Sequence, residues 1–328
     1  MEYLNFSPLT QKVSRIALGT WAIGGWMWGG TKEKEAIETI HKALDLGINL
    51  IDTAPVYGFG VSEEIVGKAI KSYGKRENIV IATKQGLSFE NQAIQRDARK
   101  ESIEREIEES LRRLQVDYID IYQIHWPDPL TPPRETAEAL QKLFKQGKIR
   151  AIGVSNYSIE QMEEFQKTAP IHSLQSPFNL FERAIEKEEL DYCLKKEIAT
   201  LGYGPLCRGL LTGKIQKDTQ FKGDDLRKID PKFQEPRLSQ YLNAVKKLEE
   251  WVKNKHHRSL LALAIRWVLD KGVTTALWGA RKPEQLSGME TIWNWNLTSQ
   301  DFSEIDTILS ETILDPVGPE FMAPPPHR

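Results

Sequence analysis

The segment NLIDTAPVYGFGVSEEIVGKAI, residues 49–70, passes from an apolar run through a small-residue turn into a helical pattern. Leu50 and Ile51 are typical of a buried strand, and Asp52 stands where that strand would end. Tyr57 follows five residues later and precedes two glycines. Acids and tyrosines are uncommon choices for filling a core. The segment therefore predicts a strand–loop–helix unit with polar side chains that need partners from elsewhere in the chain.

The same alternation of strand and helix extends along the chain on both sides of this segment. The expected strands cover residues 16–19, 48–52, 78–83, 118–124, 150–154, 172–175, 198–203 and 274–279. Helical patterns separate them, and Ser62 is the expected N-cap of the helix after the second strand. Strands that alternate with helices pair in parallel through right-handed crossovers. Eight such units in this length predict an α/β fold, the (β/α)8 TIM barrel.

A doubly wound sheet is the alternative arrangement for alternating strands and helices. Its dinucleotide-binding form has GxGxxG after the first strand, and the glycine-rich stretch at residues 19–30, GTWAIGGWMWGG, lacks that spacing. The chain has neither a P-loop nor a GxSxG motif. We therefore expect a single barrel domain over residues 1–328, with a long loop insertion at about 206–236 and a C-terminal tail at about 312–328.

Composition and charge exclude several classes of protein. The 328 residues are 40% hydrophobic and 27% charged, with a formal net charge of −2, so no polyanionic partner such as nucleic acid is indicated. Cys193 and Cys207 lack CxxC spacing and predict neither a disulfide framework nor a metal site, which favours a reducing, cytoplasmic location. No signal-peptide core is present, and no apolar run approaches the roughly 18 residues of a membrane span.

Four polar residues lie at or just after the ends of neighbouring expected strands: Asp52 and Tyr57 after the second, Lys84 after the third and His125 after the fourth. Chemistry in a barrel lies at the carboxyl ends of its strands, so these side chains are expected to meet. An ammonium group beside a phenol lowers the phenol pKa, and a carboxylate offsets the burial of the ammonium. With a histidine nearby, the set predicts a general acid aimed at a carbonyl oxygen.

Each of the four residues has an ordinary structural explanation when it is taken alone. Asp52 can cap a turn, Tyr57 can pack half-buried, Lys84 can be a solvated charge and His125 can be a core histidine. A hydrolytic barrel is a further alternative, but that chemistry needs two carboxyl groups and Asp52 is the one acid found at a strand end. The combination at consecutive strand ends favours the general-acid interpretation.

Short blocks spread in order over nearly the whole chain resemble the signature blocks of the aldo-keto reductases. They are GTWAIGG, NLIDTAPVYG, IATK, QIHWPDP, GVSNYS, LQSPFNLFER, YGPLCRGLLTGK and GARKPEQL. The resemblance implies an enzyme that reduces an aldehyde or ketone to an alcohol with a nicotinamide cofactor, usually NADPH, bound across the barrel mouth. It implies that Tyr57 is the proton donor and that Asp52, Lys84 and His125 support it.

The resemblance also implies which residues contact the cofactor. Ser155, Asn156 and Gln175 would hold the nicotinamide carboxamide, and Tyr203 would stack on the nicotinamide ring. The complete expected set is Trp21, Asp52, Ser155, Asn156, Gln175, Tyr203, Leu206, Arg208, Lys214, Gly279, Ala280, Arg281 and Gln285.

The phosphate groups of the cofactor are expected to lie near two other loops. The backbone of residues 204–211, together with Arg208 and Lys214, would receive the pyrophosphate. Arg281 would bind the adenosine 2′-phosphate, because its guanidinium forks around phosphate oxygens, and Lys282 is a second cation beside it.

Tryptophans predict an aromatic wall for a small carbonyl substrate. The expected substrate-binding residues are Tyr57, His125, Trp21, Trp26, Trp28 and Trp126. Aryl aldehydes and sugars both suit such a wall, while packing under loops is the structural alternative. Phe321 and Met322 in the tail either close the site or belong to a loose, solvated segment.

A barrel that binds NADPH as a redox sensor and regulates a partner protein, as channel β subunits do, is the alternative from another functional class. The presence of all four polar residues favours the enzyme, with a small-molecule substrate as its partner.

Overall fold

The computed structural model describes residues 1–89 and 93–326, and its main sheet is a closed barrel of eight parallel strands. These are β3 (Ile16–Gly19), β4 (Leu50–Asp52), β5 (Val80–Ser88), β7 (Ile119–Ile124), β8 (Ile149–Ser155), β9 (Ser173–Pro177), β10 (Ala199–Tyr203) and β11 (Thr275–Gly279). The strands follow the order β4-β3-β11-β10-β9-β8-β7-β5, and β4 also pairs with β5, which closes the sheet. The predicted (β/α)8 barrel is confirmed.

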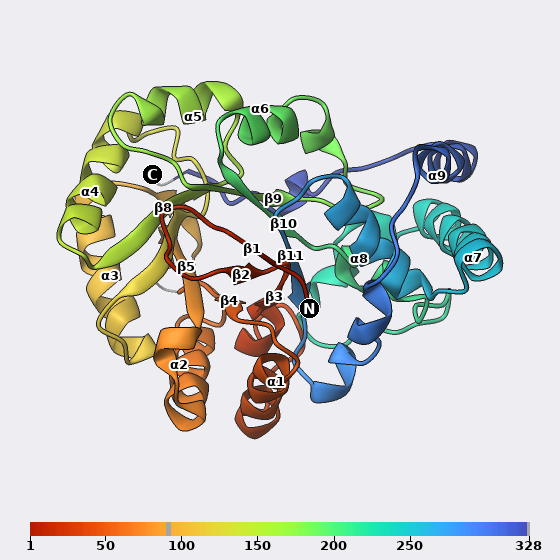
Figure 1. Cartoon of the computed structure of the whole chain (residues 1–328), viewed down its shortest axis with the longest axis horizontal. Helices are drawn as coiled ribbons and strands as arrows, with labels where there is room; N and C mark the ends of the chain where they lie inside the picture. The colour runs from red at the N-terminus through yellow and green to blue at the C-terminus, as the bar shows by residue number, and fades with distance from the viewer. Residues whose placement is uncertain (90–92, 327–328) are drawn as a thin grey trace.

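Helices surround the barrel on its outside (Figure 1). They are α1 (Glu33–Asp45), α2 (Val61–Tyr73), α3 (Lys100–Leu114), α4 (Pro133–Lys145), α5 (Ile159–Gln166), α6 (Glu189–Lys195), α7 (Arg237–His256), α8 (Leu260–Asp270) and α9 (Ser299–Thr312). In α3, Ile103, Ile107 and Leu114 recur on one face and are buried against the strands, as expected for an amphipathic helix. None of the helices in the described part of the chain combines the length and the apolar character that crossing a membrane requires.

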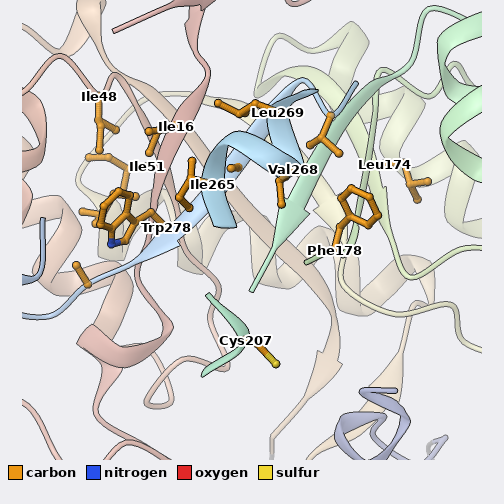
Figure 2. Packing of buried hydrophobic residues seen from close by; sticks show 14 of the residues in the cluster. Ile16, Ile48, Ile51, Leu174, Phe178, Cys207, Ile265, Val268, Leu269 and Trp278 are labelled. Carbon is orange, nitrogen blue, oxygen red and sulfur yellow. The ribbon is translucent and has the colours of Figure 1, made fainter. Parts of the chain in front are cut away.

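The larger hydrophobic core lies between the strands and the helices. Figure 2 shows Ile265, Val268 and Leu269 of α8 packed in this layer, with Trp278 of β11 beside them. Nearly every residue of α8 is buried, because the helix is mostly apolar and packs against both α7 and β11. This layer holds the strand ends in place from outside the barrel.

A second apolar cluster fills the inside of the barrel. It comprises Phe6, Val13, Ala17, Leu50, Val80, Ala82, Ile121, Ala151, Leu201 and Leu277. Phe6 and Val13 belong to the N-terminal hairpin, in which β1 (Tyr3–Leu4) pairs with β2 (Val13–Ser14) and lies across one end of the barrel (Figure 1). The other end of the barrel, at the carboxyl ends of the strands, is left for polar side chains.

Strand alternation decides which polar side chains occupy that end. Side chains two positions apart on a strand point to the same face of the sheet. Asp52 follows Leu50 by two positions on β4, and Lys84 follows Ala82 by two positions on β5. Both therefore point into the barrel directly above the apolar cluster.

Two local predictions about this region were wrong. The third strand was expected to cover residues 78–83 with Lys84 just after it, but β5 continues through Lys84 to Ser88, because its last residues pair antiparallel with β6 (Gln95–Asp97). Ser62 is not an N-cap, since α2 begins at Val61 and Ser62 is buried in its first turn. The Ser62 hydroxyl instead contacts the side chains of residues 20 and 53, which ties α2 to the ends of β3 and β4.

The segments after β10 and α9 approach the barrel mouth without forming long helices. The segment between β10 and α7 contains three short 3₁₀ turns, Cys207–Thr212, Leu226–Lys228 and Pro231–Phe233. After α9 the chain returns across the barrel and forms one more turn, Glu320–Met322.

Candidate active site

Lys84 is the centre of a buried polar cluster beneath the barrel mouth. Its Nζ donates hydrogen bonds to Asp52 Oδ1 at 2.6 Å, to the Thr53 carbonyl at 2.9 Å and to the Tyr57 hydroxyl at 3.2 Å. An ammonium group has three donors, so all three are used. Asp52 and Lys84 are 2% and 0% exposed, which isolates this ion pair from water. The structure thus brings together three of the four residues selected from the sequence.

The Asp52 carboxylate is held from a second side by two amides. Gln175 Nε2 donates to Asp52 Oδ2 at 2.8 Å, and Gln123 Nε2 lies 3.4 Å from the same oxygen. Thr20 donates both its backbone N–H and its hydroxyl to the Asp52 carbonyl. Gln123 and Thr20 were missed by sequence reasoning, although Gln123 follows inward-pointing Ile121 by two positions on β7 and strand alternation signals its direction.

His125 directly follows β7 and lies beside Tyr57. The two ring centroids are 5.7 Å apart with an interplanar angle of 80°, and the His125 backbone N–H donates to the Gln85 carbonyl at 2.6 Å. Burial, and secondarily the positive charge of Lys84, holds the pKa of His125 well below its usual range. The imidazole is therefore neutral at neutral pH, so it can orient a substrate oxygen without adding charge.

The pKa of Tyr57 departs from the sequence-based expectation. Lys84 was expected to lower it, but burial, and secondarily the negative charge of Asp52, raises the Tyr57 pKa well above 10. Lys84 does not reverse this shift because its charge is balanced by Asp52 at 2.6 Å. The phenol therefore keeps its proton at neutral pH, while the positive charge of Lys84 balances the Asp52 carboxylate.

The loop that carries Tyr57 lies backbone to backbone against the loop after β3. A Cβ atom added to Gly58 would come within 2.1 Å of the Gly24 carbonyl oxygen, and Gly58 has a φ of 69°. Only glycine fits both the contact and the left-handed backbone at this position. This backbone contact fixes the position of the loop that carries Tyr57 relative to the ends of the strands.

Gly58→Ala is expected to lower kcat and the free energy of unfolding together, because it displaces the Tyr57 loop. Gly147→Ala is the matched control, since Gly147 has a φ of 75° but nothing within 4 Å of an added Cβ. The control should cost about 1–2 kcal/mol of stability for the backbone conformation and leave kcat unchanged. Thermal unfolding and turnover of both variants test this. Equal effects of the two substitutions on kcat would contradict the positioning role of Gly58.

A cavity of about 620 Å³ opens above this cluster at the carboxyl ends of the strands. Lys282, the second cation expected near the 2′-phosphate, does not line it. The other residues expected to bind cofactor or substrate do: Trp21, Trp26, Trp28, Asp52, Tyr57, His125, Trp126, Ser155, Asn156, Gln175, Tyr203, Leu206, Arg208, Lys214, Gly279, Ala280, Arg281 and Gln285. Phe321 and Met322 line it too, so the tail closes one side of the cavity and is not a loose, solvated segment.

Aromatic rings form the wall of the cavity near Tyr57. Trp21 stacks on Tyr57 with ring centroids 6.0 Å apart, and Trp28 meets Trp21 edge-on at 5.6 Å. The indole N–H groups of both tryptophans are buried and have no hydrogen-bond partner within the described residues. Trp26 packs on Phe59 at 5.2 Å. The two N–H groups point away from the open cavity, and the face that the rings present to it is apolar.

The floor of the cavity holds amide and hydroxyl groups at the ends of β8 and β10. Asn156 adopts a positive φ of 61°. Its Nδ2 donates to the His125 carbonyl at 3.0 Å and to Ser155 Oγ at 3.1 Å, and its Oδ1 accepts from the Tyr203 hydroxyl at 3.1 Å. These bonds fix the polar floor relative to His125.

Comparison with known proteins agrees with this geometry. A sequence model described as the Aldo/keto reductase family matches residues 15–310. The chain belongs to this family. Aldo-keto reductases are oxidoreductases that act on carbonyl groups and use nicotinamide cofactors, so this chain is an enzyme of that class.

Individual relatives of the reductase cover nearly its whole length. Aldo-keto reductase YhdN of Bacillus subtilis is 58% identical over 326 residues, which are 99% of this chain and 98% of the relative. The NADH-specific methylglyoxal reductase of Escherichia coli is 37% identical over 307 residues, 88% of this chain and 92% of the relative. The solved glycerol dehydrogenase AKR11B4 of Gluconobacter oxydans is 50% identical, with a TM-score of 0.88 and 98% and 99% of the two chains covered.

Two arginines expected at the cofactor phosphates of the reductase have protein partners in the structure. Arg208 donates to the carboxylates of Glu182 and Asp230, and its side chain is only 5% exposed. Its charge is therefore already offset, which departs from the expectation that it balances a pyrophosphate. Lys214, the other cation expected there, is exposed at the rim of the cavity.

Arg281 connects two loops across the cavity. Its Nη1 donates to the carbonyls of Trp28 and Gly30, in the loop after β3. The backbone N–H groups of Arg281 and Lys282 donate to Gln285 Oε1 at 2.9 Å and 3.1 Å. A guanidinium has five N–H donors, so Arg281 retains donors beyond those that Nη1 uses.

Proposed function

We propose that this aldo-keto reductase uses NADPH to reduce an aldehyde or ketone to an alcohol, with Tyr57 as the proton donor. The observation that carries the proposal is the position of Tyr57. Its hydroxyl lies 3.2 Å from the Nζ of a fully buried, carboxylate-paired lysine, and the same residue lines the cavity. A phenol that holds its proton at neutral pH and faces a cavity is suited to general acid catalysis.

The cavity fits a nicotinamide cofactor. Its volume of about 620 Å³ is within the usual range of ligand sites. A Cβ atom added at Gly204 would meet nothing within 4 Å, so a ligand can approach that backbone closely. Ser155, Asn156 and Gln175 present hydroxyl and amide groups on the floor, which suit a carboxamide. When bound, the cofactor supplies the hydride for the carbonyl carbon.

The protein's own residues handle the proton and the substrate oxygen. Tyr57 holds the proton that the substrate oxygen receives, and the Lys84–Asp52 pair fixes the Tyr57 hydroxyl. Neutral His125 is the second group placed to hydrogen-bond that oxygen, since its ring lies beside the Tyr57 ring. Two preorganised donors on one carbonyl oxygen stabilise the charge that develops there.

The substrate we propose is a small carbonyl compound that carries additional oxygen atoms or an aromatic ring. The wall of Trp21, Trp26 and Trp28 suits stacking against an aromatic ring or the apolar face of a sugar. Two relatives are named for small oxygenated compounds, methylglyoxal and glycerol. We propose that the reaction takes place in the cytoplasm, where the free thiols of Cys193 and Cys207 would stay reduced.

A panel of methylglyoxal, glyceraldehyde and a generic aryl aldehyde, each with NADPH and with NADH, tests the proposal. The absorbance of the reduced cofactor is followed in each reaction. Turnover of at least one compound, faster with NADPH, is the expected result. Cofactor binding without turnover of any carbonyl would contradict it and favour the alternative, a sensor of cofactor state.

Arg281→Ala is expected to weaken NADPH binding by roughly 10- to 150-fold and to leave NADH binding nearly unchanged. The reason is that charge-assisted hydrogen bonds to a 2′-phosphate contribute about 1.5–3 kcal/mol. Lys282→Ala is the matched control, because its Nζ already lies 3.7 Å from Glu35 Oε1 and should contribute less. Fluorescence titration gives both dissociation constants for each protein. Equal weakening of the two cofactors would show that Arg281 only joins the loops and does not recognise the phosphate.

A further inference from the structure

Four charged side chains form a buried cluster beside the cavity. Glu182 follows β9, Arg208 follows β10, and Asp230 and Lys232 lie in the segment before α7. Arg208 donates to both carboxylates, and Lys232 Nζ lies 2.9 Å from Glu182 Oε1. None of the four side chains is more than 5% exposed. The two positive and two negative charges cancel. Charged side chains can be buried without a large cost only when they are paired in this way.

The cluster is attached to the ends of the barrel strands. Asn179 Nδ2 donates to Glu182 Oε2 at 2.8 Å and to the Gly204 carbonyl at 2.9 Å. Cys207, Arg208 and Gly209 have consecutive φ values of 44°, 52° and 99°. A turn in this conformation persists only where its surroundings hold it, and here the two ion pairs of Arg208 do so. The positive charge of Arg208 is therefore paired with two carboxylates of the protein itself.

Lys232 also connects the cluster to the C-terminal tail. Its Nζ donates to the Gly318 carbonyl at 3.1 Å. The far end of the tail is held separately, since Arg96 Nε donates to the Pro324 carbonyl at 2.7 Å. Between these two attachments Phe321 lines the cavity, with its ring 5.8 Å from the Arg208 guanidinium. The Tyr241 hydroxyl, which accepts from the Val317 N–H at 3.3 Å, and the Arg96 backbone N–H, which donates to the Pro325 carbonyl at 2.8 Å, add to these attachments on either side of Phe321.

We propose that Lys232 is a positioning residue that holds the tail wall against the carbonyl side of the active-site cavity, with the cluster of Glu182, Arg208 and Asp230 as its support. The inference rests on the proposed function in one respect, that this cavity binds the carbonyl substrate. Lys232 itself does not line the cavity and acts through Gly318 and the tail.

Lys232→Met removes the donor to Gly318 and keeps most of the volume of the side chain. Loss of a hydrogen bond from a charged group should raise KM for the carbonyl substrate roughly 10-fold. The turnover number and the dissociation constant of the cofactor measured without substrate should change little, because the Lys84–Asp52–Tyr57 contacts do not involve Lys232. Lys232→Arg keeps a buried cation that can reach a carbonyl, and should restore most of the KM.

Two further variants separate tail positioning from plain stability. Arg113→Met breaks another poorly exposed cluster, in which Arg113 pairs with Glu63 and Glu106, and Arg113 does not line the cavity. It should lower the melting temperature and leave KM unchanged. The double variant Lys232→Met with Glu182→Gln restores charge balance, so it should regain melting temperature while its KM stays high.

The same proteins give a readout that does not need activity. Hydrogen exchange of the backbone amides in residues 313–326 should become faster in Lys232→Met and stay slow in Arg113→Met. If Lys232→Met does not fold, Tyr241→Phe replaces it, since the Tyr241 hydroxyl accepts from the Val317 N–H at 3.3 Å and its loss changes no charge. Tyr241→Phe should also speed exchange in the tail and raise KM, by a smaller factor.

Three outcomes would overturn the inference: a wild-type KM in Lys232→Met, a rise in KM for Arg113→Met that follows its loss of stability, or unchanged exchange of the tail amides. Failure of the wild-type protein to reduce any carbonyl compound would instead contradict the proposed function. In that case the hydrogen-exchange comparison still decides whether Lys232 holds the tail.

Discussion

Replacing Tyr57 with phenylalanine is expected to slow carbonyl reduction by about 10²- to 10⁴-fold, the usual contribution of a positioned general acid. The substitution removes only the hydroxyl that accepts from Lys84 Nζ at 3.2 Å. The stacking of the ring on Trp21 and its edge contact with His125 remain. Cofactor affinity should therefore stay nearly the same, and the loss should appear in kcat.

Tyr122→Phe is the matched control for this experiment. Tyr122 lies on β7, is fully buried, and has a hydroxyl without a partner within the described residues, so its removal takes away no hydrogen bond that the structure shows. It should keep the wild-type rate. Single-turnover rates and cofactor fluorescence titrations of both variants give the comparison. Near-wild-type turnover of Tyr57→Phe would remove Tyr57 from the role of proton donor.

Replacing Lys84 with methionine is expected to stop the reaction and to destabilise the protein at the same time. The side chain is fully buried, so the substitution leaves Asp52 as an unpaired carboxylate, which costs about 3–5 kcal/mol of folding free energy. The uncompensated carboxylate also acts on Tyr57. Burial and Asp52 already raise the Tyr57 pKa, and without Lys84 it should rise further and make the phenol a weaker acid.

A double variant, Lys84→Met with Asp52→Asn, separates the two losses. It neutralises the unpaired carboxylate, so most of the stability should return, while activity should not, because the donor that fixes the Tyr57 hydroxyl is still absent. Thermal unfolding and the pH profile of turnover are measured for the wild type, both single variants and the double variant. A Lys84→Met protein with the wild-type pH profile and most of its rate would show that Lys84 does not act on Tyr57.

Much of the fold and of the site could be predicted because the relevant patterns are local. Alternating strand and helix patterns predicted the barrel, and a barrel brings its strand ends together, which indicated that Asp52, Tyr57, Lys84 and His125 lie close to one another. Alternation of side chains between the two faces of β7 places Gln123 inside the barrel, two positions after Ile121. A glutamine in a strand does not by itself indicate a functional contact. Only the tertiary structure places its Nε2 next to the Asp52 carboxylate.

Errors of prediction occurred where a residue type has several good partners. Ser62 fits the pattern of a helix cap, but in the fold its hydroxyl is used by threonines on two other loops. Arg208 fits a phosphate ligand and lines the cavity, and its place at a cofactor phosphate stays a prediction; the sequence did not show that it also pairs with Glu182 and Asp230, which are 26 and 22 residues away. Propensity and motif describe what a side chain can do, whereas the packed neighbours decide which of those contacts is made.

The sequence by itself determined the order of strands and helices, the inward or outward direction of each strand residue, and the polar types that meet at the barrel mouth. Tertiary structure alone decided the direction of the Tyr57 pKa shift, the partners of Arg208 and the attachment of the tail through Lys232 and Gly318, which are 86 residues apart. The periodicity of apolar residues depends on residues that are close in sequence, so it can be read from the sequence alone. Burial and charge balance are properties of groups brought together across the whole chain, and they exist only once the chain has folded.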